Sequence, residues 1–233
     1  RTELHNLLDE MRARQLVVVN GPPGAGKSTL MATYIESRNL QSIWYQVDKC
    51  DQDLATFFHY LGIAARDTTP NTKPAMPHLT PEFSLGISVF AKRSFRELYQ
   101  HLEIPFLIVL DNYQDLVEDA ALHEVIQVAC TELPQGGRIV LITRNECPPA
   151  MARLRASNMV AMIEWDELQL SADDVKAIAA LHGQKLPSDE AARQLQMKVG
   201  GWAAVLSLVL QMKSYASVAD ESPAALGSVV FDY

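Results

Sequence analysis

Residues 16–29 read LVVVNGPPGAGKST, and this stretch decides the fold. It starts as a short apolar run rich in valine, turns at a Gly-Pro-Pro sequence and ends in Gly-Lys-Ser-Thr. The turn matches the pattern GxxxxGK[ST] in full. It lies between a predicted buried strand and a predicted helix, which is the context that the pattern requires. The sequence therefore predicts a phosphate-binding P-loop.

The residue types of this loop suit a polyphosphate chain. Glycines let the backbone turn its N–H groups inward toward phosphate oxygens, and the start of the next helix adds its positive end. Lys27 provides a point charge for the β- and γ-phosphates, and the Ser28 hydroxyl provides a ligand for Mg²⁺. Because proline carries no N–H, the donors are expected from Gly24 onward. The predicted nucleotide-binding residues of the loop are Gly21, Pro22, Pro23, Gly24, Ala25, Gly26, Lys27, Ser28 and Thr29.

A second apolar run, residues 106–110, ends in Asp111. An apolar strand that ends in aspartate, some 80 residues after a P-loop, is typical of the Walker B element, whose carboxylate holds the magnesium ion. Asn112 follows, where many P-loop ATPases have an acid that orients or deprotonates the attacking water. Since an amide cannot accept a proton, Asn112 is expected only to position water, and hydrolysis is expected to be slow. The predicted metal ligands are Ser28 and Asp111.

Arg144 follows a further apolar run, residues 137–143. Ligands of parallel sheets bind at the carboxyl ends of the strands, so Arg144 is expected at the same edge as Gly21 and Asp111. A guanidinium there can contact the γ-phosphate and report its presence; the alternative is an ordinary exposed arginine. No [NT]KxD motif occurs, which favours adenine over guanine. The predicted ligands are ATP or ADP with Mg²⁺, and the predicted catalytic residues are Lys27, Asp111 and Arg144.

Apolar runs alternate with helical patterns through the first two thirds of the chain. This alternation predicts an α/β fold of the P-loop NTPase type (ASCE/AAA-like), with a parallel five-stranded sheet flanked by helices. The predicted strands are residues 16–20, 42–47, 106–110, 137–143 and 159–163, and the predicted helices are residues 28–38, 53–64, 87–102, 118–133 and 149–157. Pro70, Pro74, Pro77 and Pro81 predict a long loop over residues 66–84.

No strand pattern appears after about residue 168. Ser171 and Asp174 form a capping box, Ser188 precedes an acidic helix start, and a third apolar helix begins near Trp202. The sequence predicts a P-loop domain over residues 1–167, a small all-α domain over residues 168–222, and the start of a following winged-helix domain over residues 223–233. We expect the chain to be part of a longer protein.

The bulk composition excludes several other kinds of site. A net charge of −8 argues against a surface that grips a phosphate backbone, so this segment is not expected to contact nucleic acid. No run of 18 apolar residues occurs, which argues against a membrane span. Cys50, Cys130 and Cys147 lack CxxC spacing and predict reduced thiols in a cytoplasmic protein.

Further short motifs follow the P-loop in a fixed order. They are residues 43–48 (IWYQVD), 90–93 (FAKR), 110–113 (LDNY), 143–144 (TR), 148–149 (PP), 154–156 (LRA) and 200–203 (GGWA). This order, over nearly the whole chain, resembles the nucleotide-binding module of the MalT-like transcription activators. Those proteins carry LuxR-type DNA-binding tails and belong to the STAND class of signal-transduction ATPases.

The resemblance implies a switch. ADP would hold a closed monomer, and ATP together with an inducer, bound by regions outside this chain, would open it to self-associate. Arg144 matches the sensor arginine of the family. The family usually has two acids where this chain has Asp111 and Asn112. Related proteins have a GxP motif whose proline lines the nucleotide site. This chain has Gly201-Trp202-Ala203 there, with alanine in place of the proline. Trp202 is therefore expected either near the nucleotide or in the helical core.

Two other classes of function remain open. A P-loop enzyme such as a small-molecule kinase would use the proline-rich loop as a lid, but that loop offers only Arg66 and Lys73 to clamp a transferred phosphate. An AAA+ ring ATPase would need an arginine finger that acts across subunits, for which Arg153 and Arg155 are the candidates.

Overall fold

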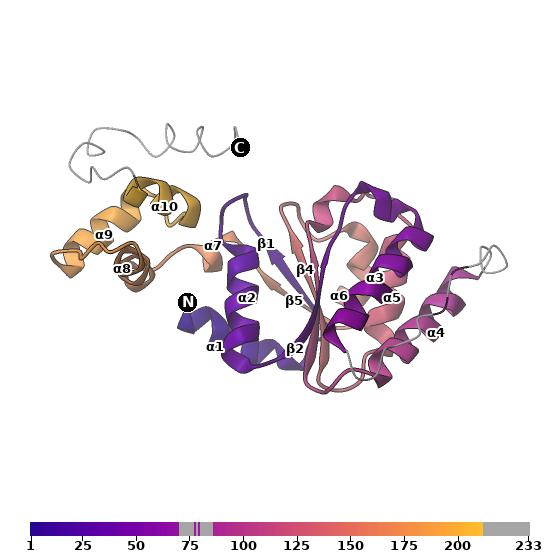
Figure 1. Ribbon diagram of the computed structural model, residues 1–233. Coiled ribbons are helices and arrows are strands. Elements are labelled where there is room, and N and C mark those ends of the chain that lie inside the picture. The colour runs from indigo at the N-terminus through magenta and orange to yellow at the C-terminus, as the bar shows by residue number, and fades with distance from the viewer. Residues whose placement is uncertain (70–76, 78, 80–85, 212–233) are drawn as a thin grey trace. The chain divides into compact units, whose positions relative to one another are not determined.

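The computed structural model describes residues 1–69, 77, 79 and 86–211, which form two compact units (Figure 1). The first, here called the sheet unit, comprises residues 6–20 and 31–163. The second, here called the helical unit, comprises residues 1–5, 21–30 and 164–211 of the described chain. Most of the predicted proline-rich loop and all of residues 223–233 lie outside the described residues. The P-loop thus groups with the helical unit, and the domain boundary at residues 167–168 stays a prediction.

Five parallel strands form the sheet in the order β2-β3-β4-β1-β5. They are β1 (Leu16–Asn20), β2 (Gln41–Gln46), β3 (Phe106–Asp111), β4 (Gly137–Thr143) and β5 (Val160–Ile163). Every residue of β3 and β4 is buried, as expected for inner strands of a parallel sheet, and most of these residues are apolar. Each predicted strand is found within one residue, and the predicted α/β fold is confirmed.

Helices cover both faces of this sheet (Figure 1). On one face lie α3 (Leu54–Thr68), α4 (Ile87–Gln100) and α5 (Leu122–Glu132), and aromatic rings join them: Phe58 meets Phe90 edge to face at 4.8 Å. On the other face lie α1 (Thr2–Glu10) and the later part of α2 (Lys27–Arg38). A short helix, α6 (Ala152–Ala156), precedes β5.

Three helix predictions need correction. No helix was predicted before residue 28, but Thr2–Glu10 form α1, which buries Leu4 and Leu8 at a spacing of four residues. Helix α3 continues four residues beyond its predicted end. The predicted helix over residues 118–133 begins only at Leu122, because the preceding residues form turns, with the N–H of Ala120 bonded to the carbonyl of Val117.

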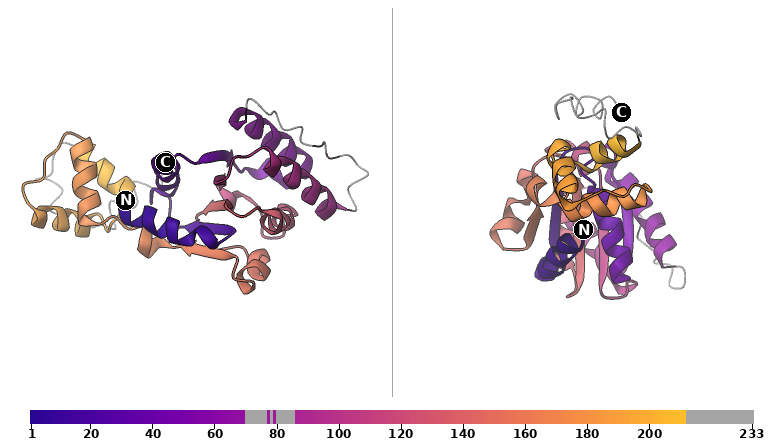
Figure 2. Two further views of the ribbon diagram at one scale, coloured as in Figure 1. Left: turned by 90° about the horizontal axis from the view of Figure 1, so that it is seen from below. Right: turned by 90° about the vertical axis from the view of Figure 1, so that its left-hand side faces the viewer.

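Between residues 164 and 211, the helical unit contains α7 (Trp165–Leu168), α8 (Ala172–Leu181), α9 (Asp189–Lys198) and α10 (Ala203–Gln211). Figure 2 shows α8, α9 and α10 gathered together. Their core consists of aliphatic side chains, namely Leu170, Val175, Ala179, Leu195, Val199, Val205, Leu206, Val209 and Leu210. The predicted capping box of Ser171 and Asp174 is confirmed, and Ser188 caps α9 by accepting a bond from Ala191.

In the described part of the chain, no helix combines the length and the apolar character that a membrane crossing requires. The cysteines Cys50, Cys130 and Cys147 are free thiols, as predicted.

Candidate nucleotide site

The P-loop is folded by glycines in left-handed backbone conformations. Gly24 has φ of 72° and Gly26 has φ of 85°, values that residues with a Cβ rarely adopt. A Cβ at Gly26 would also meet the Arg1 guanidinium at 3.4 Å and the Ala203 side chain at 3.5 Å. Of the donors expected from Gly24 onward, the N–H of Ala25 bonds to the Pro22 carbonyl at 3.3 Å.

Lys27 is buried within its own loop. Its ammonium donates to the carbonyl oxygens of Gly21 at 2.5 Å and of Pro22 at 2.9 Å. The next two residues, Ser28 and Thr29, are exposed on the first turn of α2. A buried ammonium held by neutral carbonyls, beside an exposed hydroxyl at a helix start, is the arrangement that a phosphate chain with its metal ion requires.

Two residues at the start of α10 donate hydrogen bonds to the carbonyl oxygens of the P-loop. The indole N–H of Trp202 donates to Pro23 at 2.8 Å, and the backbone N–H of Ala204 donates to Gly24 at 3.0 Å. The Trp202 ring also packs edge to face on Trp165, at 5.9 Å between centroids. Trp202 is therefore more than a core side chain: it ties the start of α10 to the loop.

Arg1 is a further P-loop neighbour that sequence reasoning missed. Its guanidinium donates to the carbonyls of Leu168 at 2.7 Å and of Ala25 at 3.4 Å. Burial lowers the pKa of this guanidinium, and the Asp174 carboxylate opposes the shift. The spacing of Leu4 and Leu8 could have indicated a helix at residues 2–10, and that helix holds Arg1, the residue directly before it, in place.

Asp111 and Thr143 lie at the carboxyl edge of the sheet unit. In the strand register, Gln46 pairs with Asp111 and Asn20 pairs with Thr143, so the last residues of four adjacent strands share this edge. Asp111 is buried and accepts a bond from the Asn112 N–H at 2.9 Å. Gly21, the first residue of the P-loop, follows Asn20 in the chain.

Asn112 lies in the left-handed region, with φ of 59° and ψ of 35°. Among residues with a side chain, asparagine and aspartate tolerate this conformation best. The asparagine that departs from the two-acid pattern thus has a backbone role, which sequence reasoning did not reveal.

Arg144 follows β4 directly and is exposed. Its backbone N–H donates to the side-chain oxygen of Gln114 at 3.2 Å. Within the described residues, its guanidinium makes neither a hydrogen bond nor an ion pair, so it is available to a ligand.

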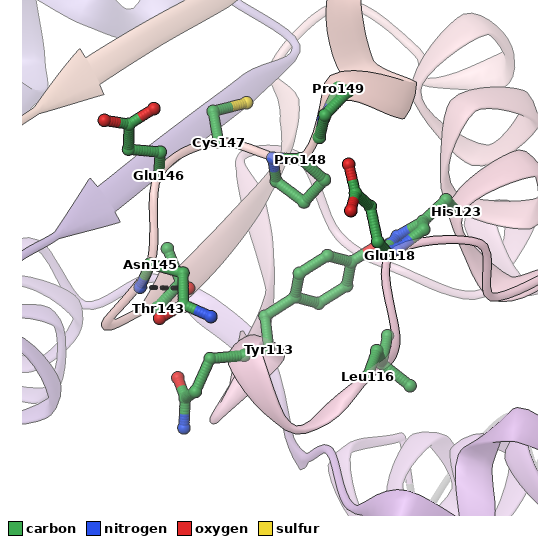
Figure 3. Close-up of a pocket in the computed structure, with 11 residues that line it drawn as sticks. Tyr113, Leu116, Glu118, His123, Thr143, Asn145, Glu146, Cys147, Pro148 and Pro149 are labelled. Atoms are coloured by element: carbon green, nitrogen blue, oxygen red, sulfur yellow. Dashed lines mark hydrogen bonds between the residues drawn. The ribbon is translucent and has the colours of Figure 1, made fainter.

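A pocket of about 260 Å³ opens at this edge, beyond β3 and β4 (Figure 3). Its centre is the Tyr113 ring, whose hydroxyl meets Nδ1 of His123 at 2.8 Å. Nε2 of His123 lies 3.0 Å from the Val117 carbonyl, which can only accept, so Nε2 carries the proton and Nδ1 accepts from Tyr113. Burial lowers the pKa of His123 and raises the pKa of Cys147, which keeps both groups neutral.

The donor set fits magnesium. The Ser28 hydroxyl and the Asp111 carboxylate are the hard oxygen ligands that Mg²⁺ prefers, and Mg²⁺ takes its remaining ligands from water and phosphate. Sequence reasoning placed both residues at the correct structural positions, the first turn of α2 and the end of β3. Whether they share one ion stays a prediction.

Comparisons with known proteins agree with this geometry. Residues 1–142 match the model of the AAA ATPase domain family. The HTH-type transcriptional regulator MalT of Vibrio cholerae serotype O1 is 28% identical over 215 residues, which are 90% of this chain but only 23% of that protein. The Walker-type ATPase paby2304 of Pyrococcus abyssi has a similar fold, with a TM-score of 0.59 and 13% identity, over 100% of this chain and 71% of its own. The resemblance to the MalT-like nucleotide-binding module is confirmed, and the chain spans about a quarter of that relative's length.

Proposed function

Because the chain belongs to the AAA ATPase domain family, we propose that it is an ATP- and ADP-binding switch module of a bacterial transcription regulator. One observation carries this proposal: Trp202 and Ala204 bond to P-loop carbonyls, so a change in the conformation of the loop would alter the contacts of α10. The similarity to a transcriptional regulator supports the biological setting. An inducer-binding region and an effector would lie in other parts of a longer cytoplasmic protein.

The nucleotide would bind to the P-loop with Mg²⁺. Loop N–H groups and Lys27 would hold the β- and γ-phosphates, and Ser28 and Asp111 would hold the metal ion. Magnesium, when bound, would neutralise charge between the phosphates. Asn112 would position water without taking its proton, so ATP would persist for long enough to act as a signal.

The switch would start at Lys27. Phosphate oxygens compete for its ammonium with the carbonyls of Gly21 and Pro22, which now hold it. The loop would relax where those bonds break, and the bonds from Trp202 and Ala204 would pass this change to α10. The ammonium and a phosphate oxygen carry opposite charges, whereas a carbonyl oxygen is neutral, so the exchange favours the nucleotide.

Arg144 would distinguish ATP from ADP. A switch needs a group that binds one conformation better than another, and only ATP has a γ-phosphate for an arginine at the strand ends to contact. The guanidinium of Arg144, which is exposed and has no partner among the described residues, suits this role. Contact with the γ-phosphate would then favour self-association of the ATP-bound form.

Sedimentation analysis tests this role with a slowly hydrolysed ATP analogue and with ADP. We expect the unaltered chain to self-associate with the analogue only. Arg144→Ala should keep its ADP affinity within about twofold and lose the response to the analogue, because its guanidinium meets only the γ-phosphate. Arg93→Ala, an exposed arginine on α4, is the control. Normal assembly of the Arg144→Ala protein would refute the assignment.

The pocket beside Tyr113 bears on the kinase alternative. If an acceptor substrate bound in this pocket, it would meet Glu118 and Glu146 but no Lys or Arg among the described residues that line it. Such a wall repels a phosphorylated acceptor. Transfer of labelled phosphate from ATP to an added metabolite would favour the kinase. Fast ATP hydrolysis by the unaltered chain that is lost in Arg153→Ala or Arg155→Ala would instead favour the ring ATPase.

A further inference from the structure

A second pocket, of about 190 Å³, lies at the amino-terminal edge of the sheet unit. Two of its lining residues, Pro105 and Gly136, immediately precede β3 and β4, so it opens at the edge opposite to Asp111 and Thr143. Its remaining walls are Leu40 and three arginines, namely Arg12, Arg38 and Arg138. We call it the arginine pocket.

A single carboxylate serves two of these arginines. Asp9 accepts from Arg12 on one oxygen, and from Nε and Nη2 of Arg38 on the other at 3.0 and 2.7 Å. The Arg38 guanidinium, followed by Arg12 and Tyr34, holds the pKa of Asp9 well below its usual range, so this carboxylate is charged at every physiological pH. Asp9 therefore offsets one of the three positive charges.

Arg138 is a buried cation with neutral partners. Its side chain is 4% exposed, and it donates to the Leu8 carbonyl and to the Tyr34 hydroxyl, each at 3.0 Å. Its guanidinium also stacks near the Tyr34 ring, 5.7 Å from the centroid. Among the described residues, no carboxylate forms an ion pair with it, although the Tyr34 hydroxyl that accepts its bond donates in turn to Asp9 at 2.9 Å. A buried charge without a counter-ion is costly, and an anion in the pocket would remove that cost.

Hydrogen-bond donors also remain for a ligand. A guanidinium carries five N–H groups, and Arg12 and Arg38 each bond to Asp9 through Nε and Nη2 alone. Arg12 also meets the Tyr34 side chain. In the described structure, Nη1 of Arg38 makes no hydrogen bond. The pocket thus combines two uncompensated positive charges with planar donors, on a chain whose net charge is −8.

We propose that the arginine pocket binds a small, doubly charged oxyanion of the phosphate class, either free or as the end group of a phosphorylated metabolite. The paired N–H groups of a guanidinium fit two oxygens of a phosphate group, and the two excess positive charges of the pocket balance the double negative charge of phosphate. The concave shape and small volume admit a single phosphate group, whereas the acidic chain disfavours the extended backbone of a nucleic acid.

Calorimetric titration tests the proposal with inorganic phosphate at constant ionic strength. Because phosphate also suits the P-loop, the titrations use the 233-residue chain with Lys27→Ala, and again the unaltered chain saturated with Mg²⁺ and ADP. We expect one binding site per chain in both. Chloride should give no site, and a comparison of free phosphate with glycerol phosphate tells which form binds more tightly.

Three variants locate the site. Arg12→Gln should weaken phosphate binding about tenfold, which is the effect of one lost charge-assisted bond. Because the Arg12 side chain is 59% exposed, the variant is expected to fold. Arg38→Gln should act alike. Arg96→Gln, an arginine with the same exposure that pairs with Glu132, should change nothing. Equal affinities in all three proteins, or binding that only follows ionic strength, would overturn the proposal.

Discussion

Asn112 shows how one residue joins a backbone requirement to a chemical consequence. Asparagine and aspartate both adopt its left-handed conformation at little cost. The backbone therefore does not explain why this chain has asparagine rather than an acid at position 112. Asn112→Asp keeps the conformation and adds a group that can accept a proton. We expect ATP hydrolysis to become about tenfold to a hundredfold faster, within the range of general-base catalysis.

A matched control exists for this variant. Asn158 also lies in the left-handed region, with φ of 56°, but it is exposed in the turn before β5. Asn158→Asp should leave the hydrolysis rate unchanged in the same phosphate-release assay. Equal rates for Asn112→Asp and the unaltered chain would mean that residue 112 does not face the attacking water.

Trp202 couples two elements, the P-loop and α10. Trp202→Phe keeps an aromatic ring against Trp165 and removes the N–H that bonds to Pro23. One neutral hydrogen bond contributes about 1 kcal/mol, so ADP release, followed with a fluorescent analogue, should become about fivefold faster. Trp44→Phe on β2 is the control. Unchanged release would show that the bond to Pro23 does not hold the loop.

His123 links α5 to the short helix at Tyr113–Asp115. Burial lowers its pKa, so the unfolded chain binds the proton more readily than the folded one. The stability is therefore present above the unfolded pKa of about 6.5 and is lost as the pH falls below it, by at most about 1.4 kcal/mol per pH unit. Urea unfolding between pH 7.5 and 5.5 should show this slope. His123→Gln should flatten it, and His59→Gln, on an exposed site, should not.

The elements differ in how far the sequence predicts them. All five strands, and the places of Lys27, Ser28 and Asp111 at the start of α2 and the end of β3, follow from local patterns, because apolar runs and the P-loop signature depend on near neighbours. Arg1 and the bond from Trp202 to Pro23 join residues far apart in sequence, and no local pattern encodes them. The arginine pocket was missed for the same reason, since Arg12, Arg38 and Arg138 come from three separate elements.

At the scale of the molecule, the chain passes between the two units several times, and the P-loop belongs to one while Asp111 belongs to the other. A nucleotide with Mg²⁺ that binds the folded chain and not the unfolded chain would raise the free energy of unfolding. At a hundredfold excess over Kd, a ligand contributes about 2.7 kcal/mol. For a chain of this size, that should raise the unfolding temperature by about 5–10 °C.

The variants separate the metal from the phosphate contribution to this stabilisation. Lys27→Ala should abolish the whole shift produced by Mg²⁺ and ADP, because the loop loses its only lysine. Asp111→Asn should keep the shift that ADP produces in the presence of a chelator and lose the increment that Mg²⁺ adds, whereas Asp119→Asn, an exposed aspartate, should keep both. Thermal unfolding with and without Mg²⁺ gives the comparison. If Asp111→Asn retained the full magnesium increment, Asp111 would not hold the ion, and its assignment as a metal ligand would be wrong.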